Sequence, residues 1–246
     1  MSPMQENIAE AFHRRTSMQA MPGMVMPAPT SPEKPVTLAL PLVEPAFSPS
    51  LEQAIVARRT GRAFDPQAEL ALATLARLLA LSLGHISSDA QGAHRAVPSA
   101  GASYPIDAYL IVQRVAGLAP GVYAYDAIAH EIDLHRLGLF PRELTAWALG
   151  QPWMAHAPVV LALVGTLGRL HKRYAARGYR YMLFEAGHVA QNLCLLGVSL
   201  GYCVQAAGGF IDRALDDLLV LKPGTRTLYL LAVGPGDLDA PLPESL

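Results

Sequence analysis

The chain has 246 residues, of which 52% are apolar and 16% charged, with a formal net charge of −1. A chain this long and this apolar can bury a sizeable core, which excludes a disordered protein. The near-zero charge gives no general attraction to nucleic acid or acidic membranes, and the low charged fraction favours burial of an apolar surface against a second subunit.

The two cysteines, Cys194 and Cys203, lie in apolar surroundings, which favours free thiols in a reducing compartment over a disulfide framework. The histidines are scattered without metal-ligand spacing, so we expect no metal site. The sequence shows neither a signal-peptide pattern nor an uninterrupted apolar run long enough to span a bilayer. We therefore expect a soluble cytoplasmic protein.

Residues 1–49 differ in composition from the rest. They hold nine of the twenty prolines, and the first 26 residues hold six of the eight methionines. Repeated proline disfavours regular structure, so we expect an extended arm. Either the arm is a partly disordered leader, or residues 36–42 lie against the body or a partner subunit. Residues 50–246 are expected to form one domain.

A helix is predicted from Leu51, with Ser50 as its N-cap. It ends in a cluster of basic residues and one hydroxyl, made up of Arg58, Arg59, Thr60 and Arg62. Guanidinium groups this close together can bind a phosphate through charge-assisted hydrogen bonds. The alternative is a solvated basic helix end that complements the helix dipole.

The next elements are read from periodicity and turn residues. We predict a turn at 65–66, a helix over 69–83, a polar loop over 85–95, a strand over 108–115 and a hairpin of strands 121–126 and 132–137. Between loop and strand, residues 98–105 read PSAGASYP and predict a tight, turn-rich connection.

Pro141 begins a further predicted helix, and the apolar run over 158–166 predicts a central strand. Residues 168–171 then link this strand to a polar cluster over 172–181, which holds three of the nine tyrosines. Such a cluster could bind an anion or move a proton. The plainer alternative is the solvated start of a buried helix.

A long helix over 180–201 carries apolar and small residues at spacings of three and four, and small residues let another backbone come close. Gly208 and Gly209 follow it; they allow positive φ and leave no Cβ between the main chain and a flat ligand. A helix over 212–219 capped by Asp212, a turn at 222–224 and a buried strand over 228–233 complete the chain. No dinucleotide G-x-G-x-x-G pattern is present.

Several of these motifs, in this order, resemble the SagB-type dehydrogenases of the nitroreductase superfamily, FMN-dependent azoline oxidases of azole-containing peptide biosynthesis. The resemblance covers roughly residues 50–235. Its motifs are RRTGRAF at 58–64, PSAGASYPIDAYL at 98–110, GVYAYD at 121–126, RGYRY at 177–181, EAGHVAQNL at 185–193, GGF at 208–210 and LYLLAVG at 228–234.

This resemblance implies an α+β fold, with a mixed, mainly antiparallel sheet wrapped by helices and a homodimer built around the long central helix. It implies that FMN lies in the dimer grooves. The implied cofactor-binding residues are Arg58, Arg59, Thr60, Arg62, Ser99, Gly101, Tyr104, Gly208 and Gly209, with Arg226 a further candidate for the phosphate.

The family transfers protons with an adjacent Lys-Tyr pair, and this chain departs from that pattern. Arg173 stands before Tyr174, and Lys172 lies one position earlier. Tyr174 and Lys172 are the predicted catalytic residues, because neighbouring cations favour the phenolate form of a tyrosine. Arg173 is a poor proton carrier since it stays charged. Alternatively, these residues only bind a phosphate or a substrate carboxylate.

Three functions remain open at this point. The first is oxidation of azoline rings in a peptide or small molecule, in a complex with a cyclodehydratase. The second is NAD(P)H-dependent reduction of nitro, quinone or ene compounds. The third is a flavin-binding scaffold subunit of a peptide-modifying complex, which the departure from Lys-Tyr would explain.

Overall fold

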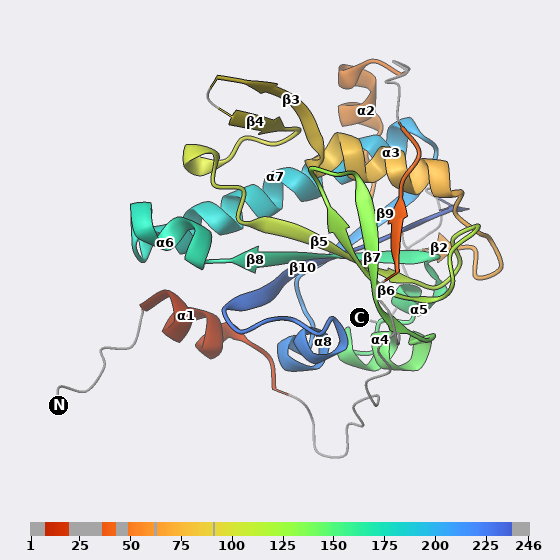
Figure 1. Ribbon diagram of the computed structural model, residues 1–246. Helices are drawn as coiled ribbons and strands as arrows, with labels where there is room; N and C mark the ends of the chain where they lie inside the picture. The colour runs from red at the N-terminus through yellow and green to blue at the C-terminus, as the bar shows by residue number, and fades with distance from the viewer. Residues whose placement is uncertain (1–7, 20–35, 43–48, 62, 91, 238–246) are drawn as a thin grey trace.

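The protein was analysed as a computed structural model, which describes residues 8–19, 36–42, 49–61, 63–90 and 92–237 (Figure 1). Arg62 of the predicted phosphate site lies outside the described residues. The helices are α1 (Ile8–Thr16), α2 (Leu51–Ala57), α3 (Leu72–Leu83), α4 (Pro141–Trp147), α5 (Trp153–His156), α6 (Gly168–Tyr174), α7 (Arg177–Ser199) and α8 (Asp212–Leu218). The strands are β1 (Thr37–Ala39), β2 (Ala63–Phe64), β3 (His85–Asp89), β4 (Gly92–Arg95), β5 (Ile106–Val112), β6 (Gly121–Asp126), β7 (Glu131–Leu137), β8 (Val159–Thr166), β9 (Cys203–Ala207), β10 (Thr225–Gly234) and β11 (Gly236–Asp237).

A seven-stranded sheet runs through the molecule in the order β1-β7-β6-β5-β8-β10-β9, and each neighbouring pair is antiparallel. A parallel bridge between Leu70 and Val115 lies outside this sheet. The arrangement confirms the predicted α+β fold with a mainly antiparallel sheet.

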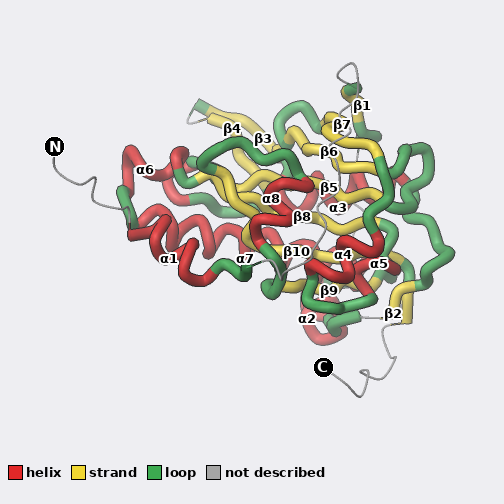
Figure 2. The backbone as a smooth tube through the Cα atoms, turned by 90° about the horizontal axis from the view of Figure 1, so that it is seen from below, coloured by secondary structure: helices red, strands yellow, loops and turns green. Residues whose placement is uncertain are grey.

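Helices cover both faces of the sheet (Figures 1 and 2). Side chains alternate between the faces along a strand. On β8, Leu161 and Leu163 therefore pack with α3 and α7, whereas Val160 and Ala162 pack with α4, α5 and α8. Because both faces are covered, β8 reads as the continuous apolar run from which it was predicted.

The long helix α7 buries one side against the sheet and leaves the other open. The small residues Ala186 and Ala190 are buried in the core of this chain. A Cβ at Gly197 would collide with Cγ2 of Val204, so this glycine lets β9 lie close to α7. Leu183 and Phe184 are 40% and 55% exposed, and α7 therefore presents an apolar face to solvent.

Two expectations for the N-terminal arm have different outcomes. Ile8–Thr16 forms a helix, so the prediction of an extended arm is wrong there. This stretch contains no proline, and Phe12 packs edge-on against Tyr179 with ring centroids 5.7 Å apart. Farther on, β1 pairs with β7, so this part of the arm lies against the body, as one alternative predicted. The boundary at residue 49 stays a prediction.

The predicted polar loop over 85–95 is wrong, because β3 and β4 form a two-stranded hairpin there. The hairpin has mostly polar residues and lacks the apolar alternation from which strands were read. Polar side chains stabilise it instead: His94 and Asp89 form an ion pair at 2.7 Å, and the His85 ring bonds the Ser88 hydroxyl at 2.9 Å.

Two further corrections concern the helices beside the polar cluster and after the glycine pair. The predicted link over 168–171 belongs to α6, which continues to Tyr174 before Ala175, at φ 46°, breaks the chain direction. Asp212 does not cap α8, because Ile211 is the N-cap residue. The Asp212 carboxylate instead accepts a hydrogen bond from the backbone N–H of Met18 at 2.8 Å.

None of the described helices combines the length and the apolar character needed to cross a membrane. Within the same described residues, no group of three or more His, Cys, Asp or Glu side chains is arranged to bind a metal ion.

Candidate functional site

The predicted catalytic residues lie at the end of α6. Lys172 and Arg173 are exposed, whereas Tyr174 is half-buried. The Tyr174 ring packs edge-on against Tyr181 of α7, with centroids 4.9 Å apart. α6 is short and polar, and its buried Leu170 anchors it next to Gly178, where a Cβ would lie 2.8 Å from the Leu170 Cβ. A missing side chain on α7 thus lets α6 come close.

The turn after Pro98 contacts the C-terminal end of α6. Arg173 donates a hydrogen bond through Nη1 to the carbonyl oxygen of Gly101 at 3.2 Å. A Cβ on Gly101 would collide with that nitrogen and would lie 2.8 Å from the Tyr174 hydroxyl oxygen. The structure therefore brings Gly101 together with Tyr174, although the two are 73 positions apart.

Ser99 and Tyr104 complete this first group. The Ser99 hydroxyl accepts a hydrogen bond from the Tyr104 N–H at 2.8 Å. The Arg95 guanidinium stacks on the Tyr104 ring at 4.9 Å from its centroid, and the Arg95 N–H donates to the Tyr104 hydroxyl. Arg169, held by two hydrogen bonds to Asp107, donates to the Tyr104 carbonyl at 2.8 Å.

A pocket of about 280 Å³ opens between this turn and α7. It is lined by Pro98, Ser99, Ala100, Tyr181, Phe184, Glu185 and His188. Glu185 is only 3% exposed, and burial raises the pKa of its carboxyl group, while hydrogen bonds from Ser99 and the Ile106 N–H and the charge of Arg95 oppose that rise.

Glu185 was not among the predicted site residues. A signal was present: Glu185 lies three residues after Met182 and four before Val189, both buried, so it falls on the apolar stripe of a helix. Carboxyl groups are rarely buried without a partner, so an acid at such a position marks a candidate site.

A second group of predicted residues gathers around the end of α2. The N–H of Gly61 donates to the Val204 carbonyl at 3.4 Å, and a Cβ there would lie 2.6 Å from the Cys203 sulfur. Arg58 is half-buried, and its charge acts against the rise that burial causes in the pKa of Cys194. Thr60 is exposed.

The Arg59 side chain bonds the C-terminal end of α2, because its Nη1 donates to the carbonyl oxygens of Val56 and Arg58, each at 2.9 Å. Arg58 and Thr60 are therefore the described residues of this segment that best fit a phosphate group.

The glycine pair follows β9 and belongs to the same side of the molecule. Neither glycine adopts the positive φ that was allowed for. Gly208 is exposed, and a Cβ there would meet only the edge of the Tyr229 ring, at 4.0 Å. Its main chain is thus open to a flat ligand. Gly209 is more enclosed, since its Cβ would lie 3.1 Å from Leu149.

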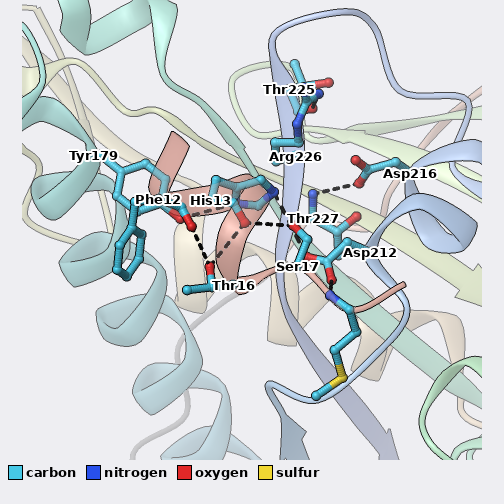
Figure 3. A network of polar contacts seen from close by, with 11 residues as sticks. Phe12, His13, Thr16, Ser17, Tyr179, Asp212, Asp216, Thr225, Arg226 and Thr227 are labelled. Carbon is cyan, nitrogen blue, oxygen red and sulfur yellow. Dashed lines mark hydrogen bonds and ion pairs between the residues drawn. The ribbon is translucent and has the colours of Figure 1, made fainter. Parts of the chain in front are cut away.

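Arg226 lies in a different environment from Arg58. It is the second residue of β10 and lies near α1 and α8, where its charge acts on His13 and Asp216 (Figure 3). α2 lies on the opposite side of the sheet from α8 (Figure 1). The structure therefore groups Arg226 with the acidic residues of α8 and not with the end of α2.

The two groups of predicted cofactor residues lie near different halves of α7. Glu185 marks the first group and Cys194 the second. The two residues are nine positions apart along the helix, a rise of roughly 13.5 Å. Within one chain, the two groups therefore lie apart along α7.

A model described as the nitroreductase family matches residues 55–235. Among curated proteins, a presumed nitroreductase of Methanocaldococcus jannaschii is 36% identical over 184 residues, covering 75% of this chain and 90% of its own. The trifolitoxin-processing protein TfxB of Rhizobium leguminosarum is 30% identical over 141 residues, which cover 54% of this chain but only 38% of TfxB.

Solved structures share the fold at lower identity. A presumed nitroreductase of Ralstonia eutropha superposes with a TM-score of 0.73 at 24% identity, covering 87% of this chain and 96% of that one. A chain of the E. coli microcin synthetase McbBCD complex, solved with truncated pro-MccB17 bound, gives 0.69 at 21%, covering 94% and 92%. A presumed nitroreductase of Exiguobacterium sibiricum in complex with FMN gives 0.59 at 13%, covering 82% and 95%.

Proposed function

Because this chain belongs to the nitroreductase family, whose members are oxidoreductases, we propose that it is an FMN-dependent dehydrogenase of the SagB type. In this proposal it oxidises azoline rings to azoles in a peptide or a related natural product. The observation that carries the proposal is the meeting of Gly101 and Tyr174, which places a phenol beside a turn that resembles the flavin-contacting turn of that family.

The cofactor residues fit FMN if two copies of the chain combine. Arg58 and Thr60 supply donors for the phosphate, and the open main chain at Gly208 suits a flat ring. Ser99 and Gly101 would come from the other copy, which is why the two groups lie apart here. FMN, when bound, would accept the two electrons that leave the substrate.

A homodimer is part of this proposal, and the open face of α7 supports it. Leu183 and Phe184 are large apolar side chains on a helix whose other side is fully packed. Next to them, a Cβ at Gly187 would meet nothing within 4 Å, so a second backbone could come close.

Tyr174 is the proposed proton acceptor, and Lys172 is a nearby cation on the same helix. Arg173 has a different role, because its guanidinium donates a hydrogen bond to the Gly101 carbonyl oxygen. We therefore interpret the departure from the Lys-Tyr pattern as a change of structural role at residue 173, with the tyrosine retained.

Two similar proteins support the proposed role in peptide modification. TfxB is named for trifolitoxin processing, and the McbBCD structure contains a microcin precursor. We propose by analogy that this chain works in a complex with a cyclodehydratase, which would form the azoline rings that this chain oxidises.

A second candidate function is an NAD(P)H-dependent reductase. The M. jannaschii relative favours it, because it covers more of this chain at higher identity than TfxB does. A flavin-binding scaffold without chemistry is the third outcome that an experiment must separate.

Two further features complete the proposal. In this proposal residues 50–246 form the flavin-binding domain, and segment 1–49 is a Pro-rich arm whose α1 and β1 lie against that domain. Two free thiols, of which Cys203 is buried, suit a reducing compartment, so we place the protein in the cytoplasm.

The test begins with the purified protein, which should be yellow and release FMN, not FAD, on denaturation. FMN-loaded protein is then incubated in air with a synthetic thiazoline peptide. Under the proposal, the product is a thiazole peptide with two hydrogen atoms fewer than the thiazoline substrate. A colourless protein that takes up no FMN on reconstitution would exclude all three flavin-dependent functions.

A further inference from the structure

The turn that carries Ser99, Gly101 and Tyr104 has an unfavourable backbone. Gly101, Ala102 and Tyr104 have φ angles of 57°, 50° and 42°, in the left-handed region. For Ala and Tyr this conformation is strained, and strained backbone persists only where surrounding contacts hold it. The contacts that hold this turn therefore decide its shape.

Several contacts come from residues on the open side of the turn. Arg169 and Arg173 bind its carbonyl oxygens, at Tyr104 and Gly101. Both arginine side chains belong to α6, a helix of seven residues. The turn also needs an anchor in the main body of the protein.

Glu185 of α7 is that anchor. Its carboxyl group accepts a hydrogen bond from the Ser99 hydroxyl at the start of the turn and another from the Ile106 N–H just after it. The Ser99 hydroxyl oxygen also accepts a hydrogen bond from the Tyr104 N–H. The single hydroxyl proton of Ser99 is therefore still available for the bond to Glu185. A carboxylate can accept both bonds at once.

We propose that Glu185 is a positioning residue that ties both ends of the strained turn 99–104 to α7 and so holds the turn in its cofactor-binding shape. The cofactor part of this inference rests on the proposed function. The anchoring part concerns this chain alone.

The surroundings of Glu185 provide the hydrogen bonds and the positive charge that a buried carboxyl group needs. A buried carboxyl group is costly unless it is hydrogen-bonded and its charge is balanced. The positive charges of Arg95 on β4 and, more weakly, Arg169 on α6 favour the ionised form of this carboxyl group and lower its pKa. An apolar residue would fill the same stripe of α7 at lower cost, but it would leave the Ser99 hydroxyl and the Ile106 N–H without this partner.

The test measures amide hydrogen exchange in the FMN-free protein and FMN affinity by fluorescence. In Glu185→Leu, amides of residues 99–104 should exchange at least about tenfold faster, because the two lost hydrogen bonds together are worth at least about 1.4 kcal/mol. Exchange in β8 should stay unchanged. The Kd for FMN should rise by up to about tenfold, since it varies inversely with the fraction of protein in which the turn is closed. Arg142→Leu, an exposed change on α4, should alter neither quantity.

Two more variants make the test specific. If Ser99 acts partly through Glu185, the two changes together should raise the exchange rates by less than the product of the single effects. Fully independent effects of Ser99→Ala and Glu185→Leu would overturn the inference. Glu185→Gln keeps the size but offers one acceptor oxygen, so it should fall between wild type and Glu185→Leu. It decides the matter if Glu185→Leu fails to fold.

Unchanged exchange at 99–104 in both Glu185 variants would overturn the anchoring role. Faster exchange with an unchanged Kd for FMN would overturn the link to the cofactor. A wild-type protein that binds no FMN would overturn the proposed function, and the exchange result would still stand or fall by itself.

Discussion

The guanidinium of Arg173 donates a hydrogen bond to the carbonyl oxygen of Gly101 across 3.2 Å. This bond joins the end of α6 to the turn after Pro98 and places the Tyr174 hydroxyl next to the same glycine. Residue 173, where the SagB-type pattern has lysine, thus has a structural task that a planar, multiply donating side chain suits.

Replacing Gly101 should therefore disrupt the site more than its backbone angle alone explains. In Gly101→Ala, the added methyl group would collide with Arg173 and crowd Tyr174. Gly117→Ala is the matched control, because Gly117 also has a positive φ, 79°, but open space around it. Turnover by the FMN-loaded protein should fall at least tenfold in Gly101→Ala only, with both variants folded by circular dichroism.

Arg58 is the described arginine best placed for the phosphate of FMN. A charge-assisted hydrogen bond contributes roughly 1.5–3 kcal/mol, so Arg58→Ala should weaken FMN binding by about one to two orders of magnitude. Equilibrium dialysis with fluorescence detection measures this. Arg142→Ala, an exposed change on α4, is the control, and equal affinities for the two variants would show that Arg58 is only a surface charge.

The open face of α7 should be the dimer interface. Phe184→Arg would put a charge into that interface and should give a monomer by light scattering at micromolar concentration. Ile128→Arg is a matched control, because both side chains are 55% exposed and Ile128 lies in the turn between β6 and β7. A monomeric wild type with flavin bound would contradict the dimer.

Docking of α1 should depend on pH through His13 (Figure 3). Burial lowers the pKa of His13 from its ordinary 6.5, Asp212 and Asp216 act to raise it, and Arg226 lowers it. The docked state therefore favours neutral imidazole, which bonds the Tyr179 hydroxyl at 3.1 Å. This contribution is present above pH 6.5 and is lost as pH falls from there through the lower docked pKa.

Nuclear magnetic resonance titration of the His13 ring checks this directly. We expect a midpoint below 6.5, and a still lower one in Asp212→Asn, because the carboxylate that raises the pKa is removed. Hydrogen exchange in residues 8–16 should quicken on acidification over the same interval. A midpoint at or above 6.5 would contradict the burial of His13 against α7 and α8.

Strands β6, β7 and β8 and the helix α7 were predictable because their information is local. The apolar run that forms β8 and the alternation in β6 and β7 are visible in short windows of sequence. The cap at Ser50 was predictable for the same reason, and its hydroxyl does accept the Gln53 N–H. These elements could be predicted without any knowledge of long-range contacts, whereas the fold class followed from the family resemblance.

The features that the sequence did not reveal depend on distant partners. α6 is short and polar, and it becomes a helix where Leu170 packs against Gly178. The surroundings of Arg226 include α1, whose His13 meets Tyr179 across 166 positions. Glu185 was overlooked because only the folded chain shows which donors meet its carboxyl group.

Tyr174→Phe separates proton transfer from binding. The change keeps the ring that packs against Tyr181 and removes only the hydroxyl, so FMN content and fold should survive. Reduction of the flavin by an azoline peptide should slow by about 10²–10⁴-fold, the usual effect of losing a general base. An unchanged rate would remove Tyr174 from the mechanism and direct attention to Lys172.

Anaerobic single-turnover mixing of the FMN-loaded wild-type protein tests the central claim most directly. The protein is mixed in separate experiments with a thiazoline peptide and with NADPH, and the absorbance of oxidised flavin is followed. An azoline oxidase should be bleached rapidly by the peptide, with a thiazole formed in equal amount, and only slightly by NADPH. Rapid bleaching by NADPH with none by the peptide would identify a reductase, and no bleaching by either would identify a scaffold; both results would contradict the account.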